Sequence, residues 1–195
     1  IALLNDLDSD IVEYKSVINI DSLTIEAITF TLNKFKNNEL FSLSEMVDRS
    51  SNNFYIGEFR KRNITFKDMQ SSGNLNLIHL DSLRQEIIHY YDVIEIIESV
   101  QETNNALIIE LSTRSSLEDF DMNSMIHSMI NAVPEVDEFD LSFFNTNRNS
   151  KEIFIYQNTQ SLKLILVMTN DNSFKRGLIT VRKLKQTINN YLEDF

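Results

Sequence analysis

The chain has 195 residues, of which 42% are hydrophobic and 24% are charged, and it contains no cysteine. This composition is typical of a folded globular protein, and it excludes disulfides, thiolate metal sites and cysteine nucleophiles. The formal net charge of −11 argues against a nucleic-acid partner, because phosphate recognition needs a surplus of Lys and Arg.

Glycine and proline are scarce, with three and one in the whole chain. A sheet-rich fold needs glycine at its tight turns, so this scarcity favours long helices joined by few corners. We predict an all-α fold in which residues 1–195 form a single helical domain. The expected architecture is an elongated antiparallel helical bundle, with two or more long heptad-patterned helices and shorter helices packed around them.

The first 36 residues contain the clearest helical pattern. Apolar residues recur there at spacings of three and four, and neither Gly nor Pro interrupts the segment. Only Asp21 breaks the series. The pattern predicts a long helix over about 2–36, with an apolar stripe formed by Leu4, Leu7, Ile11, Tyr14, Ile18, Ile25, Ile28, Leu32 and Phe35.

Two short helices are expected next, each opened by a capping box. In this motif a hydroxyl and a carboxylate three residues apart satisfy each other's backbone amides. Ser42 and Glu45 predict a helix over about 42–50. Thr65 and Asp68 predict another over about 65–72.

The second short helix should stop at a structural corner formed by Ser71, Ser72 and Gly73. A glycine just after a helix adopts the left-handed conformation without a Cβ clash. Leu75, Leu77 and Ile78 are expected to cover this corner, and Asp81 is placed to cap the next helix.

A second heptad stripe predicts a long helix over about 81–116. Gln101 and Asn104 interrupt its apolar positions, and Tyr90 and Tyr91 are adjacent on it. Polar groups on an apolar stripe can line a ligand pocket or can set the register between helices. Tyr90, Tyr91, Gln101 and Asn104 are therefore candidate ligand-binding or register-setting residues, and both interpretations stay open.

The pattern is weaker from 117 to 158, where the acidic stretch before Ser150 is typical of a loop and "IFIYQ" fits a helix or irregular structure. Two C-terminal helices are expected over about 160–169 and 173–193, the second capped by Asn172 or Ser173. Because the first and last helices both carry clean apolar stripes, we expect them to lie side by side.

No pattern of catalytic, metal or cofactor residues stands out. The stretch "DFDMNS" begins like a calcium loop, but Ser124 replaces the required glycine and Ile130 replaces the bidentate glutamate. None of His79, His89 and His127 lies in a metal-binding array. We therefore expect no catalytic residue, no metal and no cofactor.

The stretch "ITFKDMQSSGNLNLIHLDSLRQEIIHYY", residues 64–91, resembles an uncharacterised bacterial family of single-pass membrane proteins. In this family one transmembrane helix precedes a mostly helical extracytoplasmic region. The resemblance implies an anchor upstream of this segment and a periplasmic location, and it supplies no catalytic residues. The shared pattern comprises Thr65, Phe66, Ser71, Ser72, Gly73, Leu75, Leu77, Ile78, Leu83, Arg84, Tyr90 and Tyr91.

Three functions are compatible with these patterns. The first is a non-enzymatic, membrane-tethered helical scaffold, adaptor or sensor that contacts a protein partner or a second copy through its helical faces. The second is a bundle that senses a small molecule between its helices. The third is an enzyme with an unrecognised carboxylate or histidine site, such as Asp121 or His127. A cytoplasmic location is the alternative to the periplasm.

Overall fold

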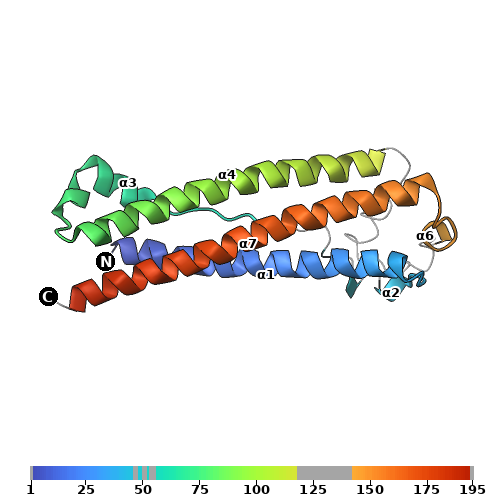
Figure 1. The fold of residues 1–195 in the computed structure, drawn as a ribbon, viewed down its shortest axis with the longest axis horizontal. Coiled ribbons are helices and arrows are strands. Elements are labelled where there is room, and N and C mark those ends of the chain that lie inside the picture. Colours follow the sequence, from blue (N-terminus) through green and yellow to red (C-terminus); the bar gives the residue numbers. More distant parts are fainter. Residues whose placement is uncertain (1, 46–47, 50–51, 53–55, 118–141, 194–195) are drawn as a thin grey trace, which may run out of the picture. The chain divides into compact units, whose positions relative to one another are not determined.

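The computed structural model describes residues 2–45, 48–49, 52, 56–117 and 142–193. These residues form helices joined by short connections, and they contain no strand (Figure 1). The predicted all-α helical bundle is confirmed. In chain order the elements are α1 (Ala2–Lys36), α2 (Leu43–Glu45), α3 (Ile64–Ser71), the 3₁₀ helix η3 (Asn74–Leu77), α4 (Asp81–Leu117), α6 (Ser142–Thr146) and α7 (Lys151–Glu193).

The two long N-terminal helices begin and end within a residue of their predicted positions. α1 stops after Lys36, and Asn38 then adopts a left-handed conformation with φ of 58°. The capping box that opens α2 is also present. The Glu45 amide and the Ser42 hydroxyl lie 3.3 Å apart, and the Ser42 amide donates to the Glu45 carboxylate at 3.3 Å. Residues 46–47 and 50 of this predicted helix lie outside the described residues.

The predicted break between two C-terminal helices is wrong, because α7 continues from Lys151 to Glu193. The polar residues that suggested a cap find partners inside the helix. The Ser173 hydroxyl donates to the Thr169 carbonyl at 3.0 Å, and Lys175 donates to Asp171 at 2.6 Å. The polar run therefore needs no chain break.

Two further expectations need correction. The stretch expected to be a loop before Ser150 contains α6. α3 begins within one residue of its predicted position, but its N-cap residue is Asn63, which makes no side-chain capping bond, so Thr65 does not cap the helix. "IFIYQ" lies within α7, in agreement with the helix that was one of its two expected states. The predicted calcium-like loop and His127 lie outside the described residues.

The corner after α3 forms as expected at Gly73, whose φ is 74°. The amides of Ser72 and Gly73 donate to the carbonyls of Asp68 and Gln70, which closes the helix. Leu75 is buried and Ile78 is partly buried against the core, whereas Leu77 is 69% exposed and does not cover the corner.

The chain divides into two compact units, and each long helix contributes residues to both. Unit 1 comprises Ile1–Ile20, Gly57–Thr103 and Thr169–Phe195. Unit 2 comprises Asp21–Ile56 and Asn104–Met168.

Unit 1 is built around α1, α4 and α7. α1 and α4 run in the same direction, and α7 runs opposite to both (Figure 1). Lys185 of α7 pairs with Asp8 of α1, so the first and last helices lie side by side as predicted. Lys183 of α7 pairs with Glu86 of α4 at 3.4 Å. The buried core is formed by Leu7, Tyr14, Val17, Phe59, Leu75, Leu83, Ile87, Tyr90, Tyr91, Ile94, Ile97, Phe174, Val181, Leu184 and Ile188.

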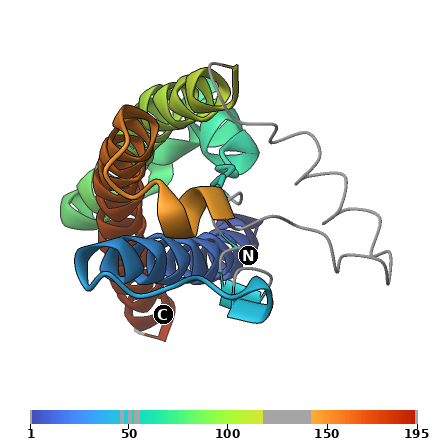
Figure 2. The same ribbon diagram turned by 90° about the vertical axis from the view of Figure 1, so that its right-hand side faces the viewer.

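Unit 2 contains an aromatic cluster where α1, α6 and α7 meet. Phe144 of α6 lies 5.8 Å from Phe41 and 5.6 Å from Tyr156 of α7, measured between ring centroids. Phe35 of α1 lies 6.0 Å from Tyr156. Viewed from this end of unit 2, α6 lies beside the end of α1 (Figure 2).

Candidate functional site

Three of the four predicted polar positions lie in unit 1. Gln101 and Tyr91 are 4% and 3% exposed, and Tyr90 is fully buried. Asn104 belongs to unit 2 and is partly buried. The structure therefore brings the two tyrosines and Gln101 into the interior of one unit.

Gln101 holds the backbone of the segment that precedes α3. Its Oε1 accepts a hydrogen bond from the Phe59 amide at 2.7 Å, and its Nε2 donates to the Phe59 carbonyl at 3.3 Å. These bonds satisfy backbone groups that would otherwise be buried without partners. Gln101 therefore acts as a structural clamp, and its place on the apolar stripe needs no ligand.

Tyr90 binds a buried carboxylate on α1. Its hydroxyl donates to Asp10 Oδ2 at 2.8 Å, and the Arg62 amide donates to Asp10 Oδ1 at 3.1 Å. Burial raises the pKa of Asp10 to about 6, although these two hydrogen bonds oppose the shift. Burial also raises the pKa of Tyr90, which keeps its hydroxyl protonated. Asp10 therefore links α1, α4 and the segment before α3 through one titratable group.

Tyr91 has a packing role. Its ring stacks on Phe66 of α3, with 4.0 Å between centroids and 11° between the planes. Its buried hydroxyl, like Oδ2 of Asp6, has no hydrogen-bond partner within the described part of the chain. The stacking of Tyr91 on Phe66 attaches α3 to α4.

Phe59 and Gly177 are core positions that the sequence pattern did not reveal. Phe59 lies in a polar stretch, but it is 1% exposed and stacks on Tyr14 at 4.0 Å. A Cβ added at Gly177 of α7 would lie 2.4 Å from Cζ of Tyr14. Tyr14 is therefore held between the segment before α3 and a glycine of α7.

Unit 2 buries polar side chains from two helices. Thr24 and Thr31 of α1 are 0% and 1% exposed, and Gln160 and Lys163 of α7 are 8% and 5% exposed. Burial lowers the pKa of Lys163 to about 8. A buried lysine of this kind can serve as an amine nucleophile or bind an anion, but it defines no reaction by itself.

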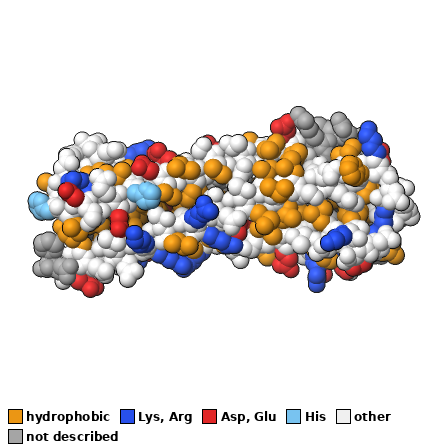
Figure 3. All heavy atoms as spheres, viewed as in Figure 1, with side chains coloured by type: hydrophobic (Ala, Val, Ile, Leu, Met, Phe, Trp, Pro, Cys, Tyr) orange, Lys and Arg blue, Asp and Glu red, His pale blue; other side chains and the backbone are white. Residues whose placement is uncertain are grey.

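The opposite face of α7 carries exposed apolar side chains in unit 2. We call this surface the α7 apolar face, and Figure 3 shows hydrophobic side chains gathered over this part of the molecule. It is formed by Phe154 at 64% exposure, Ile155 at 42%, Leu162 at 38%, Ile165 at 60% and Met168 at 45%.

The α7 apolar face is also free of charge. Between Lys151 and Lys175, the charged residues of α7 are Glu152, Lys163 and Asp171, and the last two are buried. Beyond residue 174 the exposed side of the same helix becomes strongly basic, with Lys175, Arg176, Arg182 and Lys183. The lack of charge is therefore a local property of this face.

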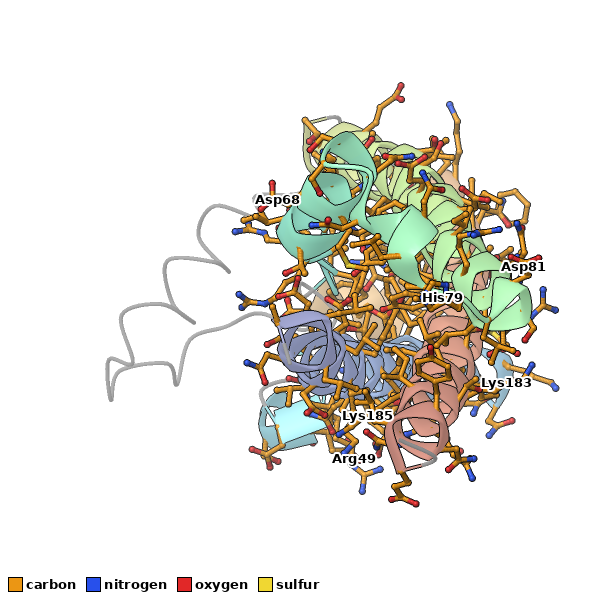
Figure 4. All side chains as sticks on the ribbon, turned by 90° about the vertical axis from the view of Figure 1, so that its left-hand side faces the viewer. Arg49, Asp68, His79, Asp81, Lys183 and Lys185 are labelled. Carbon is orange, nitrogen blue, oxygen red and sulfur yellow. The ribbon has the colours of Figure 1, made fainter. Side chains whose placement is uncertain are left out.

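Among the residues that the structure describes, the other candidate groups do not assemble into a reactive site. His79 and Asp81 are exposed at the start of α4 in unit 1 (Figure 4), and His89 is exposed further along the same helix. Within the described residues, no three His, Asp or Glu side chains converge to hold a metal ion.

Comparisons with models of known protein families, with curated proteins and with solved structures give no match. No related protein therefore indicates a function for this chain. The feature of the structure that does so is the α7 apolar face.

Proposed function

We propose that this chain is a non-enzymatic helical scaffold, adaptor or sensor domain that binds a protein helix through the α7 apolar face. The observation that carries this proposal is the set of five large apolar side chains exposed along one uncharged helix face. Contiguous exposed apolar patches mark interaction sites, and the centres of protein interfaces are depleted of charge. An apolar helix face typically binds a second amphipathic helix.

We also propose that the domain is tethered to a membrane and lies outside the cytoplasm. The support is the resemblance of residues 64–91 to membrane-anchored proteins. No helix in the described ranges is both long and apolar enough to cross a bilayer, so the proposed anchor would lie elsewhere.

Cysteine labelling in intact cells tests the location. The sequence has no cysteine, so Asn149→Cys introduces a single exposed thiol just before α7. A membrane-impermeant maleimide should label this variant in intact cells. Labelling that appears only after lysis would contradict the extracytoplasmic location.

Photo-crosslinking in cells tests the binding face. A photoreactive amino acid is placed at Ile165 of the face or, as a control, at Ile179, an exposed isoleucine of the same helix. The proposal expects a protein adduct from position 165 that is much weaker from 179 and is suppressed by Phe154→Glu. Equal adducts from both positions, or none from 165, would contradict it.

A further inference from the structure

We infer that unit 1 contains a binding site for a small monovalent cation, such as sodium, between the first turns of α1 and the tyrosine pair of α4. The ligands of this site are the carboxylates of Asp6 and Asp10 and the hydroxyl of Tyr91. All three residues belong to unit 1, whereas the α7 apolar face belongs to unit 2.

Two carboxylates of α1 lie close together in the site. Asp6 and Asp10 are four residues apart, so they share one face of the helix. Asp10 is fully buried, and Oδ2 of the partly exposed Asp6 is buried without a hydrogen-bond partner among the described residues. Burial is the main cause of the raised pKa of Asp10, and the negative charge of Asp6 adds to it. Oδ2 of Asp6 therefore lies where a positive or hydrogen-donating group is needed.

The hydroxyl of Tyr91 independently points to a bound group at the same place. The Tyr91 side chain is 3% exposed, and its hydroxyl has no partner in the described ranges. Burial raises the pKa of Tyr91, and the negative charges of Asp10 and Asp6 raise it further, so the hydroxyl lies near both carboxylates. A buried polar atom without a partner costs stability. A group bound between Tyr91 and Asp6 would satisfy both.

The groups around Asp10 supply little positive charge. Burial raises the pKa of the Tyr90 and Tyr14 hydroxyls, so both are neutral. The side chain of Arg62 is exposed and has the weakest effect among the causes that set the pKa of Asp10. Lys185 of α7, the helix beside α1, pairs with a different carboxylate of α1. A bound cation would supply the missing charge.

The number of oxygen atoms favours a monovalent cation. Carboxylate and hydroxyl oxygens suit hard cations, but Ca²⁺ requires roughly six to eight of them. No third carboxylate or histidine joins this pair within the described part of the chain, and both oxygens of Asp10 already accept hydrogen bonds. The partial exposure of Asp6 gives the cation a path from solvent, and the net charge of −11 attracts cations to the molecule.

Thermal unfolding in sodium chloride and in choline chloride tests the site, because choline is too large to enter it. At about pH 8 and constant ionic strength, replacing choline by sodium from about 1 to about 300 mM should raise the melting temperature by a few degrees, since the cation binds only the folded state. A proton competes with sodium for Asp10, whose pKa is about 6. At about pH 4.5 the rise should therefore disappear.

Two variants test the ligands. Asp6→Asn and Tyr91→Phe should each remove most of the sodium-dependent rise, and Tyr91→Phe keeps the ring that stacks on Phe66. Asp92→Asn, at an exposed position beside Tyr91 on α4, is the matched control and should respond to sodium like the parent. Circular dichroism must show that each variant keeps the helical content of the parent.

Sodium NMR relaxation detects the bound ion without unfolding the protein. The sodium line should broaden with the parent and with Asp92→Asn, and it should stay narrow with Asp6→Asn. Equal melting temperatures in sodium and choline at about pH 8, or an equal sodium response in Asp6→Asn and the parent, would overturn the cation site. Either result would leave a bridging water as the partner of the Tyr91 hydroxyl.

Discussion

At the scale of single residues, unit 1 depends on close contacts around Tyr14. The ring lies between Phe59, on which it stacks, and Gly177, where a Cβ would come within 2.4 Å of its Cζ. Stacking on one side prevents the ring from yielding to a larger residue on the other.

Gly177→Ala should therefore lower the free energy of unfolding by about 1–3 kcal/mol, the usual cost of overpacking a core. Denaturant unfolding measures the change. Tyr14→Leu removes the clashing atoms, so the double variant should lose less than the sum of the single variants. Additive losses would show that the ring does not limit position 177.

Gly73→Ala tests whether the corner after α3 requires glycine for its left-handed backbone. Nothing lies within 4 Å of the added Cβ, but the residue has φ of 74°. The expected loss is about 1 kcal/mol, which arises from the left-handed backbone alone. An unchanged melting temperature would show that the corner does not need glycine.

The raised pKa of Asp10 makes the stability of the folded protein depend on pH. Its pKa is about 6 in the folded protein against an ordinary value of 3.8, so the folded state holds the proton more tightly. The stabilisation from this proton is complete below about pH 4 and is lost as the pH rises through 6. The full loss is on the order of 3 kcal/mol.

Asp10→Asn removes this titration and keeps the shape of the side chain. Between pH 4 and 7 the free energy of unfolding of the parent should fall relative to that of the variant. Asp92→Asn, at an exposed position of α4, is the control and should leave the slope unchanged. Parallel profiles for the parent and Asp10→Asn would contradict the raised pKa.

At the scale of elements, the two units use the same device to hold non-helical backbone. Gln101 binds both backbone groups of Phe59 in unit 1. In unit 2, Asn145 accepts from the Phe41 amide at 2.8 Å and donates to its carbonyl at 3.1 Å. Each amide side chain thus fixes a segment whose phenylalanine enters the core.

Gln101→Ala should destabilise unit 1 by about 1–3 kcal/mol, because it leaves the buried amide and carbonyl of Phe59 without partners. Glu102→Ala, at the exposed neighbouring position, is the control. Hydrogen exchange at the Phe59 amide should accelerate in the first variant alone. Equal protection in both would show that Gln101 does not hold the segment.

At the scale of the whole molecule, the net charge of −11 opposes the binding of other acidic proteins. Added salt screens this repulsion, whereas it weakens contacts between opposite charges. If the α7 apolar face binds its partner through apolar contacts, raising sodium chloride from about 20 to about 500 mM in a cell lysate should preserve the crosslinked adduct at position 165. Loss of the adduct at high salt would indicate a contact based on charge.

Much of the helical framework could be predicted from local pattern. The stripes of α1 and α4 and the capping box at Ser42 arise from residues three or four positions apart, which a single helical turn brings together. The break predicted near Asn172 failed because Ser173 and Asp171 find partners within the helix. A Ser, Asp or Asn is therefore not sufficient to mark a helix end, because it can also bond to residues four positions away in a continuous helix.

The sequence by itself determined the helical class, the main helix ends and the left-handed corner at Gly73, because these depend on neighbouring residues. Only the tertiary structure decided the roles of Gln101, Tyr90 and Phe59, whose partners lie far away along the chain. It also decided which side of α7 is buried. Buried Lys163 and exposed Phe154 reverse the order that hydrophobicity alone would predict, because burial depends on which helices pack nearby.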